Sequence, residues 1–120
     1  MPVITLSGLP DGRSNEKKDE IRETIKKAVA SVRNLCLTED DVTVRMEFDG
    51  LASLDPHKQE IGVTVSNLYE GEKRTSRTIS TLQGKLGRAV AKLFPLAKLI
   101  EVDEIKTVPG GRVFVIRKGK

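Results

Sequence analysis

The sequence predicts an α+β fold in which two tandem β-α-β units form one four-stranded sheet, with two helices on one face and a further strand at the C-terminus. Hydrophobic periods typical of strand, helix and strand follow one another twice along the chain. The two halves also carry an internal sequence repeat. Each unit alone is too small to bury its face of a sheet, so the two must pack together.

The first unit begins with a β-branched run at residues 3–7, which a turn cluster at residues 8–12 closes. Ser14 is the expected N-cap of a helix whose single apolar stripe continues through about residue 33. Residues 42–48 then alternate apolar and polar side chains, as a half-buried strand does.

The second unit follows a loop at residues 49–58. It has a strand at 61–65, a turn at 69–72 and a helix capped near Thr75 or Ser76, which Pro95 ends. Residues 99–102 are a fourth expected strand. A turn at 109–111 leads to a terminal strand at 112–116.

The repeat aligns residues 4–9 with residues 63–68, an offset of 59. Two extra residues in the second turn shift the offset to 61, so that Arg13 aligns with Arg74. We therefore expect one domain over residues 1–120, with repeat units at about 2–48 and 61–104. The crossovers should be right-handed, with helices on one face of the sheet and partner subunits on the other.

Composition narrows the function classes. The chain has 120 residues, 38% of them hydrophobic and only 3% aromatic, so its core must be aliphatic. A formal charge of +4, interspersed and with few aromatics for base stacking, argues against nucleic acid and suits a small anionic substrate. No apolar run is long enough for a membrane span, and no signal peptide is evident, which predicts a cytoplasmic protein.

Several polar residues carry no expected chemistry. The single cysteine, Cys36, lies in an apolar stretch and is expected to be buried. His57 should be a solvated loop residue without metal-ligand spacing, so neither a metal nor a cofactor is expected. The acidic run at residues 39–41 is interpreted as a turn before a strand, and residues 109–111 lack the pattern of a phosphate loop.

Pro2 is the candidate catalytic residue. It follows Met1 directly, and a small second residue favours removal of the initiator methionine, which would leave a free secondary amine. Burial and neighbouring cations bring the pKa of such an amine towards neutrality, which suits proton transfer next to a carbonyl. The structural alternative is that Pro2 only begins an edge strand, where a missing N–H is harmless.

Three arginines are candidate ligands for an anionic substrate. Arg13 directly precedes the first helix, Arg45 lies inside the second strand, and Arg74 is the repeat partner of Arg13. Guanidinium groups bind carboxylates through two hydrogen bonds and stay charged at all relevant pH values. Each could instead be a solvated surface arginine, and for Arg74 both interpretations stay open.

The residues at 1–4, 11–18 and 44–46 resemble oxalocrotonate tautomerase. The resemblance implies that Pro2 is the general base and that Arg13 and Arg45 bind and polarise the substrate. The two-unit length resembles carboxymethyl-hydroxymuconate isomerase and macrophage migration inhibitory factor, which form trimers of subunits with two fused units. The isomerase pattern also implicates Arg74.

The sequence departs from that pattern in three places. Ile61 stands where the second unit would carry a proline, so each chain has at most one catalytic amine. One extra residue separates Pro2 from Arg13, which requires a small bulge. The aromatic that lines the pocket of the short enzymes has only weak candidate counterparts, Phe48 and Tyr69.

The resemblance implies a cofactor-independent keto–enol tautomerase or isomerase that acts on a small 2-oxo acid or muconate-like carboxylate, as a homotrimer. A dehalogenase or decarboxylase would use the same fold, which does not choose the reaction. The alternatives of another class are a non-catalytic interaction protein that retains Met1 and, third, a basic nucleic-acid module.

Overall fold

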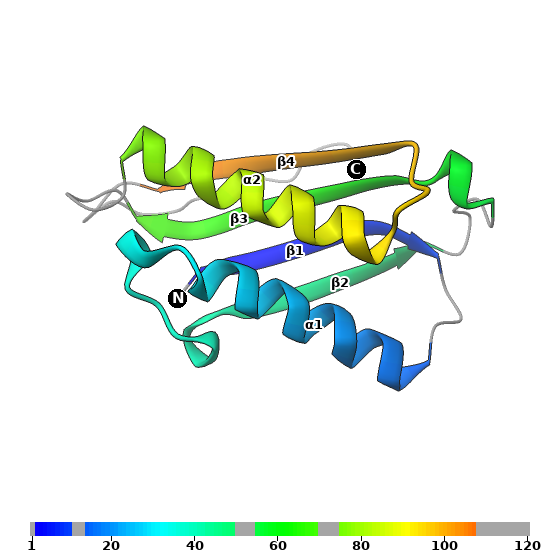
Figure 1. Ribbon diagram of the computed structural model, residues 1–120, viewed down its shortest axis with the longest axis horizontal. Coiled ribbons are helices and arrows are strands. Elements are labelled where there is room, and N and C mark those ends of the chain that lie inside the picture. The colour runs from blue at the N-terminus through cyan, green and yellow to red at the C-terminus, as the bar shows by residue number, and fades with distance from the viewer. Residues whose placement is uncertain (1, 11–13, 50–54, 70–74, 108–120) are drawn as a thin grey trace.

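The computed structural model describes residues 2–10, 14–49, 55–69 and 75–107 (Figure 1). The main elements in chain order are β1 (Val3–Pro10), α1 (Asn15–Ala30), β2 (Thr43–Asp49), β3 (Glu60–Tyr69), α2 (Ser76–Leu93) and β4 (Leu99–Thr107). Short 3₁₀ turns cover Arg33–Leu35, Glu39–Asp41 and Pro56–Lys58.

The four strands form one mixed sheet in the order β2-β1-β3-β4 (Figure 1). β1 pairs in parallel with β2, and β3 pairs in parallel with β4, so each pair is closed by its own helical crossover. The two pairs meet through β1 and β3, which are antiparallel. This arrangement confirms the expected fold class.

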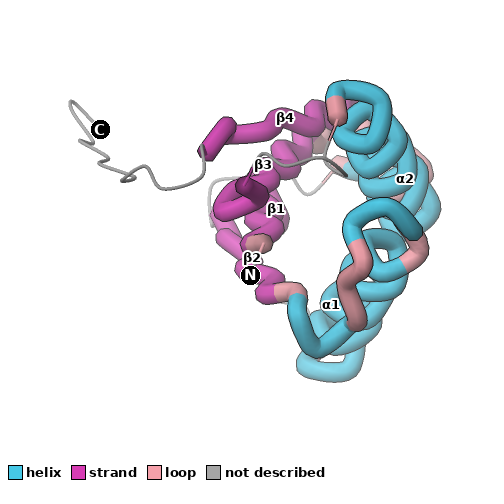
Figure 2. The backbone as a smooth tube through the Cα atoms, turned by 90° about the vertical axis from the view of Figure 1, so that its left-hand side faces the viewer, coloured by secondary structure: helices cyan, strands magenta, loops and turns pink. Residues whose placement is uncertain are grey.

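Both helices cover the same face of the sheet (Figure 2). Each contributes one buried apolar stripe, which packs on the inward side chains of the strands. Within the described residues the core is aliphatic, as expected, and Phe94 is its one buried aromatic member. The fully buried side chains that dominate it are Ile4, Leu6, Leu9, Ile21, Ile25, Val29, Ile61, Val63, Val65, Leu82 and Leu86.

The expected helix caps are present. The Ser14 hydroxyl accepts a hydrogen bond from the Lys17 backbone N–H at 3.1 Å, and Thr75, rather than Ser76, caps α2 through the Thr78 N–H at 3.3 Å. α1 ends at Ala30, earlier than the apolar stripe predicts. The stripe continues beyond the helix because Val32, in extended backbone, still buries its side chain.

Both inner strands carry a bulge at the same position of the repeat. The pairing of β1 with β2 shifts between Leu6 and Leu9, and that of β3 with β4 shifts between Val65 and Leu68. These positions are related by the repeat offset of 59. The bulge required by the extra residue after Pro2 is therefore present, and β1 continues through Pro10 instead of ending before Gly8.

The expectation of a buried Cys36 is wrong. Its side chain is exposed, because Cys36 ends a 3₁₀ turn in the left-handed conformation with φ of 54° and only the preceding Leu35 points into the core. β3 also extends to Tyr69, into the expected turn at 69–72. The rest of that turn, the turn at 109–111 and the strand at 112–116 lie outside the described residues.

The turn before β2 is a capping box. The Asp41 carboxylate accepts hydrogen bonds from the Thr38 backbone N–H at 2.9 Å and from the Thr38 hydroxyl at 3.1 Å. These two hydrogen bonds, the backbone one foremost, hold the pKa of the Asp41 carboxyl below its usual value. No helix in the described part of the chain is long and apolar enough to cross a membrane.

Gly8→Ala should destabilise the protein by about 2 kcal/mol or more. Gly8 has φ of 79°, and a Cβ there would collide with the Glu60 carbonyl oxygen of β3. Chemical denaturation measures the effect. The matched control is Gly87→Ala in α2, where a Cβ would make an ordinary 3.7 Å contact with Val102. It should stabilise by about 0.5–1 kcal/mol; equal effects of the two substitutions would contradict the bulge geometry.

Asp41→Asn should lower the melting temperature at neutral pH. A carboxyl whose pKa is depressed by folding stabilises the protein above its unfolded pKa, and this contribution is lost as the pH falls through the folded value. The difference in melting temperature between wild type and variant should therefore disappear below about pH 4. Asp40→Asn removes a neighbouring exposed carboxylate and is the control. A difference in melting temperature that stays unchanged in acid would rule out the link between Asp41 ionisation and stability.

Candidate active site

Pro2 is fixed at the start of the central strand β1. It is buried, and its carbonyl oxygen accepts a hydrogen bond from the Thr43 backbone N–H at 3.1 Å. That bond joins Pro2 to the first residue of β2, directly after the Thr38–Asp41 capping box. The position of the candidate amine is thus set by backbone pairing on β2 and by the turn that leads into it.

Arg45 lies on β2 and points to the face of the sheet opposite the helices. Its neighbours Val44 and Met46 face the core, where Val44 is buried and Met46 is partly buried. Because side chains alternate along a strand, the exposed Arg45 side chain lies on the other face. Arg45 is in register with Thr5 of β1. Thr5 is three residues beyond Pro2, which is about 10 Å along the strand. Pro2 and Arg45 therefore lie on adjacent strands, three residues apart in register.

Four polar side chains form one row across the open face of the sheet. Arg45 pairs with Thr5, Thr5 with Thr64, and Thr64 with Asp103, so the row runs across β2, β1, β3 and β4. It begins with a cation on one edge strand and ends with a carboxylate on the other. Asp103 was not a candidate from the sequence, because only the strand register shows that it is the structural counterpart of Arg45.

Arg13 and Arg74 lie outside the described residues, but their described neighbours lie at opposite ends of the sheet. Tyr69 and Thr75, which flank the segment of Arg74, lie at the end of the sheet where Pro2 begins β1 (Figure 1). Pro10 and Ser14, which flank the segment of Arg13, lie at the far end of β1 (Figure 1). This difference follows from the antiparallel pairing of β1 with β3.

The aromatic candidates do not share the face of Arg45. The Phe48 ring lies against the helix layer, where the Lys18 ammonium sits 4.7 Å from its centroid. Phe48 has the same strand parity as the core residue Val44 and so faces away from Arg45. Only the backbone of Tyr69 belongs to the described part of the chain.

His57 lies in solvent, as expected. His57 is exposed, in a 3₁₀ turn capped by the Asp55 carboxylate, which accepts from the His57 N–H at 3.0 Å. Within the described residues no group of three or more His, Cys, Asp or Glu side chains could hold a metal ion.

The architecture matches solved structures of the tautomerase superfamily. Pt0534, inactivated by 2-oxo-3-pentynoate, has a TM-score of 0.71 and 20% sequence identity over 93% of this chain and 90% of that chain. A symmetric trimer of fused 4-OT named Q0 has a TM-score of 0.66 and 17% identity over 88% of this chain and 85% of that chain. The macrophage migration inhibitory factor of Toxoplasma gondii has a TM-score of 0.64 and 18% identity over 96% and 97%.

No family model matches the sequence, and no curated protein matches it. The likeness is one of fold. The chain has the tautomerase-type fold, with two β-α-β pairs in one sheet and the candidate proline at the start of its first strand.

Proposed function

We propose that this protein is a cofactor-independent keto–enol tautomerase or isomerase in which Pro2, freed by removal of Met1, is the general acid and base. The observation that carries the proposal is the position of Pro2, buried at the start of β1 with Arg45 on the neighbouring strand. The fold adds support, because Pt0534, which is inactivated by 2-oxo-3-pentynoate, shares it. The proposed substrate is a small 2-oxo acid or a muconate-like carboxylate.

In the proposed reaction the lone pair of the Pro2 nitrogen removes the proton of the substrate enol, or of the carbon next to its carbonyl. The electrons move into the conjugated oxygen–carbon framework, and the prolinium then returns the same proton to a different atom. No redox step or co-reactant is needed. Burial disfavours the charged form of such an amine, which favours a basic lone pair at the Pro2 nitrogen.

Arginine side chains hold the substrate in this proposal. Arg45 binds the carboxylate through two hydrogen bonds and offsets negative charge on the enolate oxygen. Arg74 would come from the segment that follows β3 at the Pro2 end of the same chain. Arg13 would come from another copy of the chain, because its segment leaves β1 at the end away from Pro2.

A homotrimer would bring such copies together. Among the described strands β2 and β4 are the two edges of the sheet, and an edge strand offers backbone hydrogen-bonding groups to a neighbour. Arg45 on one edge and Asp103 on the other have opposite charge, which suits a head-to-tail contact that closes into a ring. Leu99 and Ile105 on β4 are 42% and 50% exposed and would be covered there. The fused 4-OT named Q0 forms a symmetric trimer with this fold.

Two alternatives keep the fold and change the function. A dehalogenase or decarboxylase would use Pro2 and the same arginines on a different small acid. The other alternative is a non-catalytic interaction protein that retains Met1. The Pro2 nitrogen is then an amide without a basic lone pair and cannot act as a base. The proposal includes two expectations from the sequence, a cytoplasmic location and no nucleic-acid partner.

Pro2→Ala should reduce kcat/KM for ketonisation of phenylenolpyruvate by about 10²-fold or more, the contribution of a positioned acid–base group. The matched control is Pro10→Ala, at the other end of β1, which should keep its rate within a small factor. Intact mass must show the loss of Met1 in the active preparation. Equal rates for wild type and Pro2→Ala would refute the mechanism, and a retained methionine would favour the interaction protein.

The mass in solution should be three times that of the 13.2 kDa chain. Light scattering coupled to size exclusion measures it directly. Asp103→Lys should shift the distribution towards smaller species, because it places a cation opposite Arg45 of the neighbouring copy. Glu23→Lys, on the exposed face of α1, makes the same charge change away from the sheet edges and should leave the trimer intact. A wild-type protein that stays monomeric would contradict the proposed assembly.

A further inference from the structure

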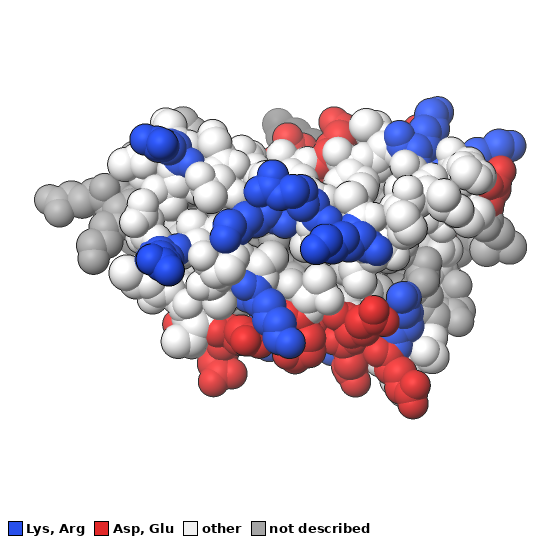
Figure 3. Space-filling model, viewed as in Figure 1, with Lys and Arg blue, Asp and Glu red and all other residues white. Residues whose placement is uncertain are grey.

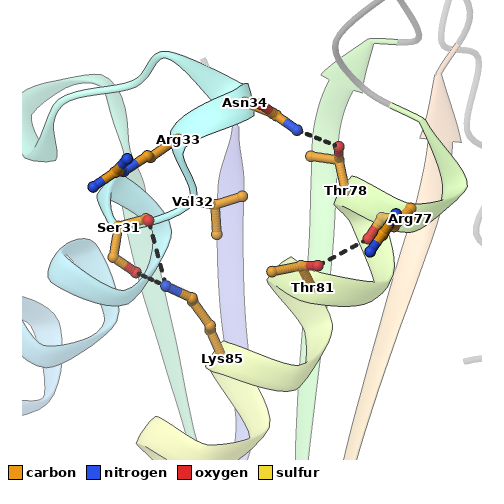
Figure 4. A pocket seen from close by; sticks show the side chains of 8 residues that line it. All are labelled: Ser31, Val32, Arg33, Asn34, Arg77, Thr78, Thr81 and Lys85. Atoms are coloured by element: carbon orange, nitrogen blue, oxygen red, sulfur yellow. Dashed lines mark hydrogen bonds between the residues drawn. The ribbon is translucent and has the colours of Figure 1, made fainter.

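A concave site lies in the helix layer, between the end of α1 and the first turns of α2 (Figure 4). Its volume is about 310 Å³, at the lower end of the range for small-molecule pockets. Residues 31–34 form one wall, and α2 side chains from Arg77 to Lys85 form the other. Pro2 does not line this pocket, so it is a separate site from the proposed catalytic one.

The pocket is positively charged. Three of its eight lining residues are cations, Arg33, Arg77 and Lys85, and none is acidic. Within the described part of the chain the ion pairs lie elsewhere, and none involves these three side chains. The whole of α2 contains no aspartate or glutamate. Figure 3 shows basic side chains across the middle of the helical face, while the largest group of acidic ones lies along the lower edge and smaller groups lie at the upper edge and the right.

Lys85 is held in place within this pocket. Its ammonium group donates hydrogen bonds to the Ser31 hydroxyl at 3.0 Å and to the Ser31 carbonyl oxygen at 3.4 Å (Figure 4). Both acceptors are uncharged, so the positive charge of Lys85 is positioned without being neutralised. Lys85 also interacts favourably with the C-terminal end of α1, where Ser31 is the cap.

The opposite wall of the pocket is also held in place by hydrogen bonds. Thr78 is only 4% exposed, and its hydroxyl oxygen accepts a hydrogen bond from the Asn34 side-chain amide at 3.3 Å. The Thr75 and Thr78 hydroxyls share a further hydrogen bond at 3.2 Å. This arrangement joins the turn after α1 to the first turn of α2 and leaves a second amide hydrogen of Asn34 for a ligand.

Arg33 and Arg77 lie on opposite sides of the pocket (Figure 4). Both are exposed, and Arg33 points away from Lys85 (Figure 4). A bound anion would draw these long side chains in by a change of rotamer, whereas Lys85 and Asn34 are already positioned. The alternative is that Lys85 only caps α1 and both arginines are solvated; the three positive charges would then lie close together with no described acidic lining residue to offset them.

We infer that this pocket binds a small molecule through a phosphate or carboxylate group. Guanidinium and ammonium groups with amide and hydroxyl donors are the chemistry that both oxyanions require. The inference goes beyond the proposed function and does not depend on it, since the site shares no residue with Pro2, Arg45 or the segments of Arg13 and Arg74.

The test is a titration followed by ¹H–¹⁵N NMR at constant ionic strength, with inorganic phosphate in one arm and succinate in the other. At least one of them should give saturable shifts at the amides of Ser31, Asn34 and Thr78. Lys85→Met should weaken binding about tenfold, the effect of losing one charge-assisted hydrogen bond. Arg88→Met removes a cation from the same helix outside the pocket and should stay within twofold of wild type.

Arg77→Gln supplies a second variant, which leaves the contact of Lys85 with Ser31 intact and should also weaken binding severalfold. The arm that saturates identifies the ligand group. Shifts that never saturate in either arm, or equal weakening by Arg88→Met and Lys85→Met, would overturn the inference. Saturable shifts confined to Val3 and Thr43 would place the anion at the Pro2 site and would also overturn it. Pro2→Ala should bind like wild type, so failure of the catalytic proposal leaves this result unaffected.

Discussion

The pairing of β1 on both of its edges is the constraint on which the rest of the structure depends. β1 bonds in parallel to β2, which completes the first β-α-β unit, and antiparallel to β3, which joins the two units. The first pairing holds Pro2 against Thr43 and sets Arg45 opposite Thr5. The second decides which segments lie at the Pro2 end of the sheet. A change in the β1–β2 register would move Arg45 along the sheet relative to Pro2.

Much of this fold could be predicted from local signals. Ser14 and Thr75 cap their helices because a hydroxyl before an apolar stripe satisfies free N–H groups, and this pattern is visible in the sequence. The bulge in β1 followed from one extra residue. Cys36 could not be placed, because its exposure depends on a left-handed turn that no neighbouring residue predicts. The sequence also predicts ends for β3 and β4 that come too early, because the last residues of these two strands are stabilised by pairing with each other.

The candidate site was only partly predictable, for a topological reason. Arg13 and Arg74 occupy the same position of the repeat, yet their flanking residues lie at opposite ends of the sheet because β1 and β3 run in opposite directions. The repeat could not show this. Nor could it show the pocket in the helix layer, whose cations come from segments more than 40 residues apart in the chain. Charges that lie close in space but far apart in sequence need the packing of α1 on α2 to become visible.

The central claim is that the Pro2 nitrogen is a basic amine held at the start of β1. The most direct measurement is the ¹⁵N chemical shift of Pro2 in selectively labelled protein as a function of pH. The account predicts a single titration below that of an exposed proline amine, because burial disfavours the prolinium. A nitrogen that does not titrate, as an amide would behave, or one that titrates like a fully solvated amine, would contradict the account.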